Sequence, residues 1–200
     1  MVISISNRDR KIKNIKRAGE KMFKKFYPYE YIENVFYIDY RKLYEKGYRG
    51  IIFDIDNTLV PHGTDSVREI DELFKFIQNI GFKTILLSNN GEERIKRFLK
   101  NIDSLYISNA EKPKIDGYLK AMDMLKLRRN QVVFIGDQVF TDIYGANKAG
   151  IANILVKYIG YYEKEKKGTR RNLEKIILKL YKRNKSCRNR IGDIQIREEI

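Results

Sequence analysis

The chain has 200 residues, of which 42% are hydrophobic and 12% aromatic, enough apolar material for one domain with a core. One cysteine, Cys187, and one histidine, His62, exclude an intramolecular disulfide and a cysteine-based zinc site. The formal net charge is +15 and is concentrated in residues 1–50 and 161–200, which favours either an anionic partner or a solvated basic surface.

The N-terminal part is basic and then rich in aromatic residues. Residues 8–26 have apolar side chains at helical spacing, with lysines mostly on the other faces, and predict a basic amphipathic helix. Such a helix is suited either to lie on a membrane surface or to dock on the domain. A short helix is expected over 40–46. No signal peptide or membrane-spanning run is recognisable, so the expected location is the cytoplasm.

From Gly50 onward, short apolar runs alternate with helical patterns. The expected strands cover 50–55, 82–87, 104–108, 131–135 and 152–156. The expected helices cover 66–80, 91–101, 114–126 and 139–149. Ser66 and Glu69 form a predicted capping box for the first of these helices, and Gly81 is expected to end it. This alternation predicts an α/β fold: a mostly parallel sheet with helices on both faces.

The C-terminal part has one more clear element. Residues 169–183 predict an amphipathic helix, and 184–200 are expected to form a frayed or disordered tail. We therefore divide the chain into four parts. They are a basic and aromatic segment packed on the core (1–49), the α/β core (50–160), a segment with the amphipathic helix (161–183) and the tail (184–200).

Polar side chains follow the expected strands, where ligands of open parallel sheets bind. Those singled out are Asp54, Asp56, Thr58, Ser88, Asn89, Lys112, Asp137 and Asp142. A phosphate monoester repels carboxylates, and Mg²⁺, which prefers oxygen ligands, cancels that repulsion. A lysine and hydroxyl groups can hold the remaining phosphate oxygens. This set indicates metal-assisted phosphoryl transfer.

The motifs DIDNT (54–58), SNN (88–90), Lys112–Pro113 and GDQVFTD (136–142) resemble the four motifs of the haloacid dehalogenase phosphohydrolase superfamily. The resemblance implies a three-layer Rossmann-like fold and a Mg²⁺ cofactor. It implies that Asp54 is the nucleophile and Asp56 the general acid and base. It assigns the metal to Asp54, the Asp56 carbonyl and Asp137, with Asp142 either binding the metal directly or standing behind its ligands. It assigns the phosphate to Thr58, Ser88 and Lys112 and to the backbone N–H of Asn89.

Two other kinds of acidic site have requirements that this chain does not meet. A calcium-binding EF-hand loop would need glycine and glutamate where the chain has Leu59 and Asp65, and is discarded. A receiver domain lacks a second aspartate two residues after the phosphate acceptor. His62, in the loop after the first motif, either touches substrate or is a plain loop residue.

The intervals between the motifs are too short for a cap domain, which points to the capless type IIIA branch. Within it, residues 21–183 resemble the YqeG-like phosphatases, whose relatives include phosphatidylglycerophosphate phosphatases. The implied function is hydrolysis of phosphatidylglycerophosphate at an anionic membrane surface, by a peripheral protein of its inner face. The alternatives are a soluble sugar- or nucleotide-monophosphate phosphatase closed by oligomerisation, and a basic nucleic-acid- or ribosome-binding protein.

Overall fold

The computed structural model describes residues 23–159 and 169–196, and these residues form a three-layer α/β structure. Six strands make one sheet in which every neighbouring pair is parallel. In spatial order the strands are β1 (Glu30–Ile32), β6 (Ala152–Val156), β5 (Val132–Gly136), β2 (Gly50–Phe53), β3 (Lys83–Leu87) and β4 (Leu105–Ile107). The predicted fold class is confirmed.

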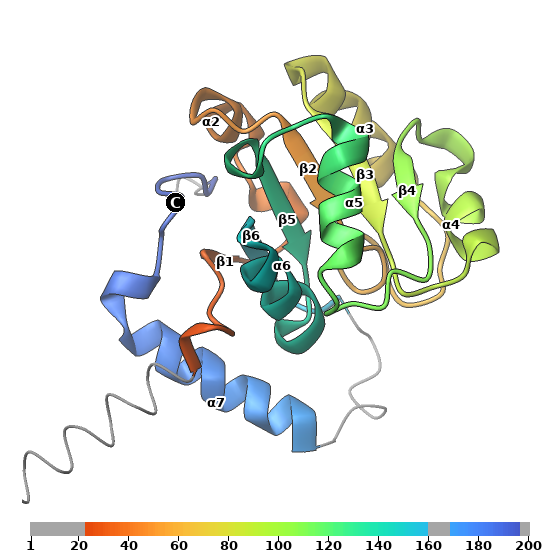
Figure 1. Ribbon diagram of the computed structural model, residues 1–200. Coiled ribbons are helices and arrows are strands. Elements are labelled where there is room, and N and C mark those ends of the chain that lie inside the picture. Colours follow the sequence, from red (N-terminus) through yellow and green to blue (C-terminus); the bar gives the residue numbers. More distant parts are fainter. Residues whose placement is uncertain (1–22, 160–168, 197–200) are drawn as a thin grey trace, which may run out of the picture.

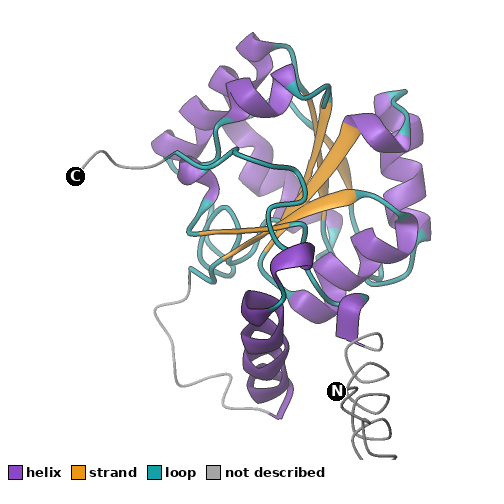
Figure 2. Cartoon of the chain, turned by 90° about the vertical axis from the view of Figure 1, so that its left-hand side faces the viewer, coloured by secondary structure: helices purple, strands orange, loops and turns teal. Residues whose placement is uncertain are grey.

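Helices cover both faces of the sheet, as Figures 1 and 2 show. They are α2 (Tyr40–Glu45), α3 (Arg68–Ile80), α4 (Glu92–Phe98), α5 (Asp116–Leu125), α6 (Tyr144–Ala149) and α7 (Thr169–Arg183). Successive residues of a strand point to opposite faces. Ile51 therefore belongs to the apolar cluster beneath α2, α3 and α4, whereas Ile52 belongs to the cluster beneath α5 and α6.

The helix α3 packs on the core through one apolar face and ends at a glycine. Its buried residues recur at helical spacing: Ile70, Leu73, Phe74 and Ile77. Gly81 follows with φ of 112°, a conformation that glycine adopts without steric cost, and it ends the helix as expected. The predicted capping box is wrong. The Ser66 hydroxyl bonds to the Asp71 carboxylate instead, and no side chain caps the helix.

The fourth expected helix, 139–149, is divided in two. Residues Val139–Ile143 form a single wide π-helical turn, η4, and Tyr144–Ala149 continue as α6. The wide turn directly follows β5 and contains Asp142. Such turns are frequent at functional sites.

The C-terminal residues differ from the expected loose tail over 184–196. Ile194 is buried, and its carbonyl accepts a hydrogen bond from the Asp39 N–H. The Glu30 carboxylate in β1 accepts the backbone N–H groups of Ile191 and Gly192. This segment therefore closes over the β1 edge of the sheet.

The helix predicted over 8–26 lies outside the described residues except at its last positions. Phe26 packs there against Phe140 and Tyr144, so this end of the segment contacts the core. Within 23–159 and 169–196, no helix is long and apolar enough to cross a bilayer.

Candidate active site

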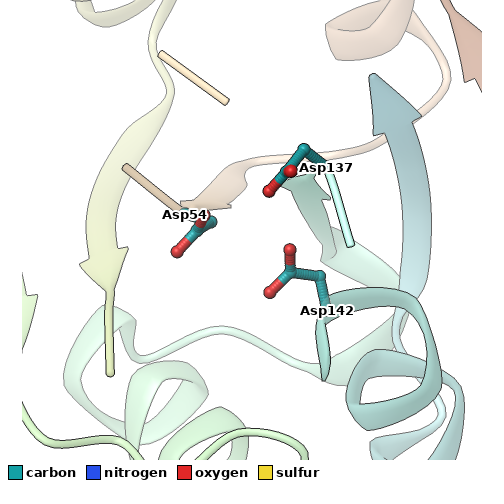
Figure 3. A group of neighbouring side chains, drawn as sticks. All are labelled: Asp54, Asp137 and Asp142. Carbon is teal, nitrogen blue, oxygen red and sulfur yellow. The ribbon is translucent and has the colours of Figure 1, made fainter. Parts of the chain in front are cut away.

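The candidate active site lies where β2, β5 and β3 end side by side. Asp54 directly follows β2, and its backbone N–H still bonds to the Ile135 carbonyl of β5, which extends the ladder by one residue. Asp137 follows β5 and Ser88 follows β3. The three central strands thus deliver these side chains to one edge, and Figure 3 shows the carboxylates of Asp54, Asp137 and Asp142 pointing toward a common centre.

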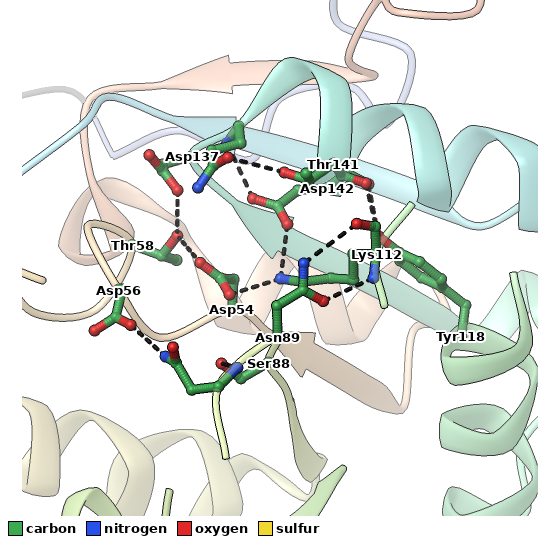
Figure 4. A network of polar contacts seen from close by, with 12 residues as sticks. Asp54, Asp56, Thr58, Ser88, Asn89, Lys112, Tyr118, Asp137, Thr141 and Asp142 are labelled. Atoms are coloured by element: carbon green, nitrogen blue, oxygen red, sulfur yellow. Dashed lines mark hydrogen bonds and ion pairs between the residues drawn. The ribbon is translucent and has the colours of Figure 1, made fainter. Parts of the chain in front are cut away.

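Lys112 joins two of these carboxylates. Its Nζ lies 2.6 Å from Asp54 Oδ1 and 2.7 Å from Asp142 Oδ1, and all three side chains are buried. The Thr58 hydroxyl lies 3.3 Å from Asp54 Oδ2 and 3.5 Å from Asp137 Oδ1. Figure 4 shows the resulting chain of contacts. Residues of three of the four predicted motifs are therefore joined through Asp54.

Three buried carboxylates with one ammonium group between them leave an excess of negative charge. Oxygen atoms of Asp54, Asp137 and Asp142 lie within 4.8 Å of one another. Burial first, and then the neighbouring Asp142, raise the pKa of Asp54 to about 6, although Lys112 works in the opposite direction. An all-oxygen donor set of three buried carboxylates fits a hard divalent cation.

Both oxygens of Asp142 have protein partners. Oδ1 receives Lys112, and Oδ2 accepts the Gln138 N–H at 3.0 Å. The Tyr118 hydroxyl donates to the Thr141 and Asp142 carbonyls at 3.0 and 3.2 Å, and so fixes the wide turn. Asp142 is therefore held in place to orient Lys112.

We expect Gly136→Ala to lower kcat roughly 10- to 100-fold while the protein remains folded. A Cβ atom at residue 136 would lie 2.6 Å from Asp142 Oδ2, so the carboxylate must move and Lys112 loses a fixed partner. Steady-state kinetics on a soluble phosphomonoester and the circular dichroism spectrum would measure the two effects. Gly91→Ala is the matched control, because a Cβ there meets no neighbouring atom. Equal activity of Gly136→Ala and Gly91→Ala would contradict this role of Asp142.

The loop after β2 turns sharply and brings Asp56 to the opposite side of the cleft. Asn57 adopts φ of 63°, which asparagine tolerates better than most residues, and its side chain accepts the His62 N–H. The Asp56 carboxylate accepts the Gly63 N–H and Arg94 Nη2, both at 3.0 Å, and the Asn90 amide.

These contacts determine the charge of Asp56. Burial alone would raise its pKa, but the hydrogen bonds from Gly63, Asn90 and Arg94 outweigh burial and lower the pKa below the ordinary value. His62 Nδ1 lies 3.4 Å from the same carboxylate. The environments of Asp54 and Asp56 therefore shift the two pKa values in opposite directions.

Asn89 has a second role that the sequence did not indicate. It was expected to offer its backbone N–H to phosphate. Its side chain accepts the Lys112 N–H at 2.7 Å and donates to the Lys112 carbonyl at 3.2 Å. The amide thus clamps the backbone of the lysine that contacts Asp54. Ser88 is buried, and its hydroxyl accepts the Asn90 N–H.

These residues surround a cleft of about 140 Å³. Its lining comprises Asp54, Asp56, Asn57, His62, Ser88, Asn89, Asn90, Lys112, Gln138 and Thr141. Sites that enclose a whole small molecule usually measure about 300–1,000 Å³. The cleft is therefore suited to a phosphate group, with the remainder of the substrate outside it.

Arg94, in the first turn of α4, is a site residue that the sequence analysis missed. Its Nη2 atom bonds to Asp56 and also to the Thr64 carbonyl at 2.6 Å. Arg97 of the same helix bonds to the Gly63 carbonyl and to Asp65. The two arginines hold the loop after Asp56 against α4. Arg94 lies four residues after Asn90, the last residue of the SNN motif, and this spacing is the feature of the sequence that could have identified Arg94 as a site residue.

Known proteins resemble this chain over most of its length. A family model for haloacid dehalogenase-like hydrolases matches residues 64–150. A protein of Bacillus subtilis named probable phosphatase YqeG is 38% identical over 140 residues, covering 68% of this chain and 80% of the relative.

The chain belongs to the YqeG-like family of the haloacid dehalogenase superfamily.

Solved structures of low identity also match this chain in part. An uncharacterised protein of Listeria monocytogenes is 21% identical, with a TM-score of 0.47 over 67% of this chain and 99% of that one. The cobalt-bound deoxy-D-mannose-octulosonate 8-phosphate phosphatase of Haemophilus influenzae is 17% identical, with a TM-score of 0.43 over 70% and 92% of the two chains. The expected membership of this YqeG-like family is confirmed, and the chain is a haloacid dehalogenase-type phosphatase.

Proposed function

We propose that this phosphatase is a Mg²⁺-dependent phosphomonoester hydrolase that works through an aspartyl-phosphate on Asp54, with phosphatidylglycerophosphate as its substrate. The observation that carries the reaction is the position of Asp54. Its two oxygens contact Lys112 and Thr58 at the cleft, and Asp56 lines the same cleft. A nucleophile, a proton-transfer group and a cation therefore surround one phosphate-sized space.

In the first step, an Asp54 oxygen forms a bond to phosphorus while the bond from phosphorus to the ester oxygen breaks. Asp56 donates its proton to that leaving oxygen, and the free alcohol departs. The negative charge of a bound phosphate favours the protonated form of Asp56 and so offsets the effect of Arg94. Lys112 stabilises the charge that develops on the transferring group.

In the second step, water attacks the phosphorus of the aspartyl-phosphate. Asp56, now a carboxylate, takes a proton from that water. The bond between phosphorus and the Asp54 oxygen breaks, inorganic phosphate leaves and the Asp54 carboxylate is restored. The proton that Asp56 gave away in the first step is regained in the second.

The metal would be held by the side chains of Asp54 and Asp137 and by the backbone carbonyl of Asp56, with Asp142 behind them holding Lys112. When bound, Mg²⁺ would neutralise charge on the phosphate oxygens and on the nucleophile. The buried cluster of three carboxylates supports this assignment.

A lipid substrate is supported by the size of the cleft and by one helix. Because β2–α3 and β3–α5 are joined without a cap domain in the described residues, no inserted domain encloses a bound molecule. Ile177 and Tyr181 of α7 pack with residues of η4, the turn that carries Asp142. On the exposed part of the same helix, Leu173 and Ile176 lie close in sequence to Lys175 and Lys179. Such a surface suits an anionic bilayer.

A soluble sugar or nucleotide monophosphate is the alternative substrate, and a nucleic-acid partner is an alternative that the basic ends favour. We expect the purified protein with Mg²⁺ to hydrolyse phosphatidylglycerophosphate in mixed micelles with a kcat/KM at least tenfold above that for soluble phosphomonoesters. A panel of sugar and nucleotide monophosphates, measured under the same conditions, decides between a lipid and a soluble substrate. Higher kcat/KM on a soluble member of the panel would reject the lipid.

The membrane part of the proposal has its own variants. Lys175→Glu with Lys179→Glu should reduce sedimentation with phosphatidylglycerol liposomes at low salt and lower activity on lipid roughly tenfold. Activity on a soluble phosphomonoester should stay unchanged. The control is Lys75→Glu with Lys120→Glu. It makes the same change of charge on α3 and α5 in place of α7. Equal effects of the two pairs, or no sedimentation of the wild type, would reject docking through α7.

A further inference from the structure

A second and larger cavity lies at the opposite end of the sheet from Asp54. Its volume is about 590 Å³, and its lining includes Tyr29, Tyr48, Arg128, Arg129, Asn130 and Gly150. None of these residues belongs to the phosphatase site. The volume falls within the range of about 300–1,000 Å³ that is usual for pockets binding small molecules.

The topology brings these residues together. Tyr29 precedes β1, Tyr48 precedes β2, Gly150 precedes β6, and Arg128 to Asn130 precede β5. Since β1, β6, β5 and β2 are neighbours in the sheet, their amino ends form one continuous floor. The cavity therefore depends on the same rigid strands as the phosphatase site, but at their other ends.

The cavity carries positive charge without an internal counter-ion. No acidic side chain lines it, and within 23–159 and 169–196 neither the Arg128 nor the Arg129 guanidinium has an acidic partner. Gly150 has φ of 70°, and a Cβ there would lie 3.0 Å from Arg129 Nη1, so the missing side chain lets the guanidinium rest against the backbone. Paired guanidinium groups are suited to phosphate oxygens.

The other side of the cavity is aromatic and held in place. The Arg190 guanidinium lies 3.6 Å from the centre of the Tyr29 ring and also donates to the Tyr27 carbonyl. The Arg49 guanidinium donates to the Tyr48 carbonyl at 2.7 Å. The Tyr48 ring packs against the core, and together with Tyr29, which carries Arg190 on one face, and the Asn130 amide it offers ring surface and hydrogen-bonding groups to a flat heterocycle.

We propose that this cavity binds a nucleoside phosphate, with the phosphate groups on Arg128 and Arg129 and the base against Tyr29 and Tyr48. A nucleotide combines the two features that the cavity provides, an anion and a flat polar ring. The site is distinct from the phosphatase cleft, and it does not depend on the substrate proposed above.

Isothermal titration of the full chain with ADP in EDTA tests the proposal, since the chelator prevents metal-dependent turnover. We expect one saturable site, with adenosine and inorganic phosphate each binding at least tenfold more weakly than ADP. Arg128→Gln with Arg129→Gln should weaken ADP binding at least tenfold, or about 1.4 kcal/mol, and leave phosphatase activity unchanged. Tyr48→Leu should weaken ADP binding but leave phosphate binding unchanged.

The matched control is Lys75→Gln with Lys120→Gln, which removes the same charge from exposed positions on α3 and α5. Three results would overturn the proposal. They are no saturable binding of ADP at millimolar concentrations, equal weakening by the two double variants, and binding confined to single-stranded RNA. Unchanged ADP binding in the arginine variant would place the nucleotide in the phosphatase cleft and reject the second site.

Discussion

Asp54→Asn is expected to reduce turnover of any phosphomonoester by about 1,000-fold or more. The amide cannot form the acyl-phosphate, and it also loses the charge that attracts Lys112. Asp123→Asn is the control, because Asp123 is an exposed carboxylate on α5, away from the cleft. Single-turnover measurement of phosphate release would detect residual chemistry. A kcat within tenfold of the wild type would reject Asp54 as the nucleophile.

The same variant should be more stable than the wild type in metal-free buffer at pH 7.5. Because burial and Asp142 raise the pKa of Asp54 to about 6, from 3.8 in the unfolded chain, the folded state holds a proton that the unfolded state has lost. Stability therefore falls as pH rises from about 4 to about 6, and the buried charge costs on the order of 3 kcal/mol above that range.

Thermal unfolding at two pH values checks this sign. Asp54→Asn should raise Tm by a few degrees at pH 7.5 and by less at pH 5, where Asp54 of the folded wild type is largely protonated. Added Mg²⁺ should stabilise the wild type more than the variant, since the variant has one charged ligand fewer. If Asp54→Asn has a lower Tm than the wild type at pH 7.5, the ionised Asp54 does not destabilise the metal-free site.

The second large effect concerns the metal. Activity should disappear in EDTA and return with Mg²⁺ or Mn²⁺. Asp137→Ala should raise the Mg²⁺ concentration needed for half-maximal activity by about 10- to 100-fold or more. Asp137 is buried at the end of β5, and its Oδ1 shares the Thr58 hydroxyl with Asp54, so alanine removes a charge from the centre of the site.

Titration of activity with Mg²⁺ at fixed substrate measures the shift. Asp103→Ala, at an exposed position ahead of β4, should leave the titration unchanged. Full wild-type activity in chelator would reject the metal mechanism. A normal Mg²⁺ requirement in Asp137→Ala would instead assign the metal to other residues.

The central strands could be predicted because their sequences are mostly apolar and have polar residues just after their ends. Residues 50–53, 83–87, 132–136 and 152–156 are all strands in the structure. Strands of a parallel sheet are buried on both faces, so they appear in the sequence as short apolar runs in place of alternating apolar and polar residues. The meeting of Asp54, Asp137 and Lys112 followed from the same rule, since parallel strands end at one edge.

Other features depend on contacts that one segment does not encode. β1 is three residues long and begins with Glu30, and a charged residue argues against a buried strand. The partners that make its burial possible, the N–H groups of Ile191 and Gly192, lie about 160 residues away in the sequence. The capping interaction failed because Asp71 competed for Ser66. The bond from Arg94 to Asp56 joins residues 38 positions apart, and helical periodicity only identifies Arg94 as a polar position.

The closure of the β1 edge by residues 191–194 has a consequence for the order of events during synthesis. β1 leaves the ribosome early, yet its sheet partner β6 follows about 120 residues later, and the N–H groups that satisfy Glu30 come later still. A nascent chain therefore carries β1 as a strand with an open edge until residues 191–194 have been made. A stop codon just before residue 191, although it spares every residue of the phosphatase cleft, would leave that edge open to other chains.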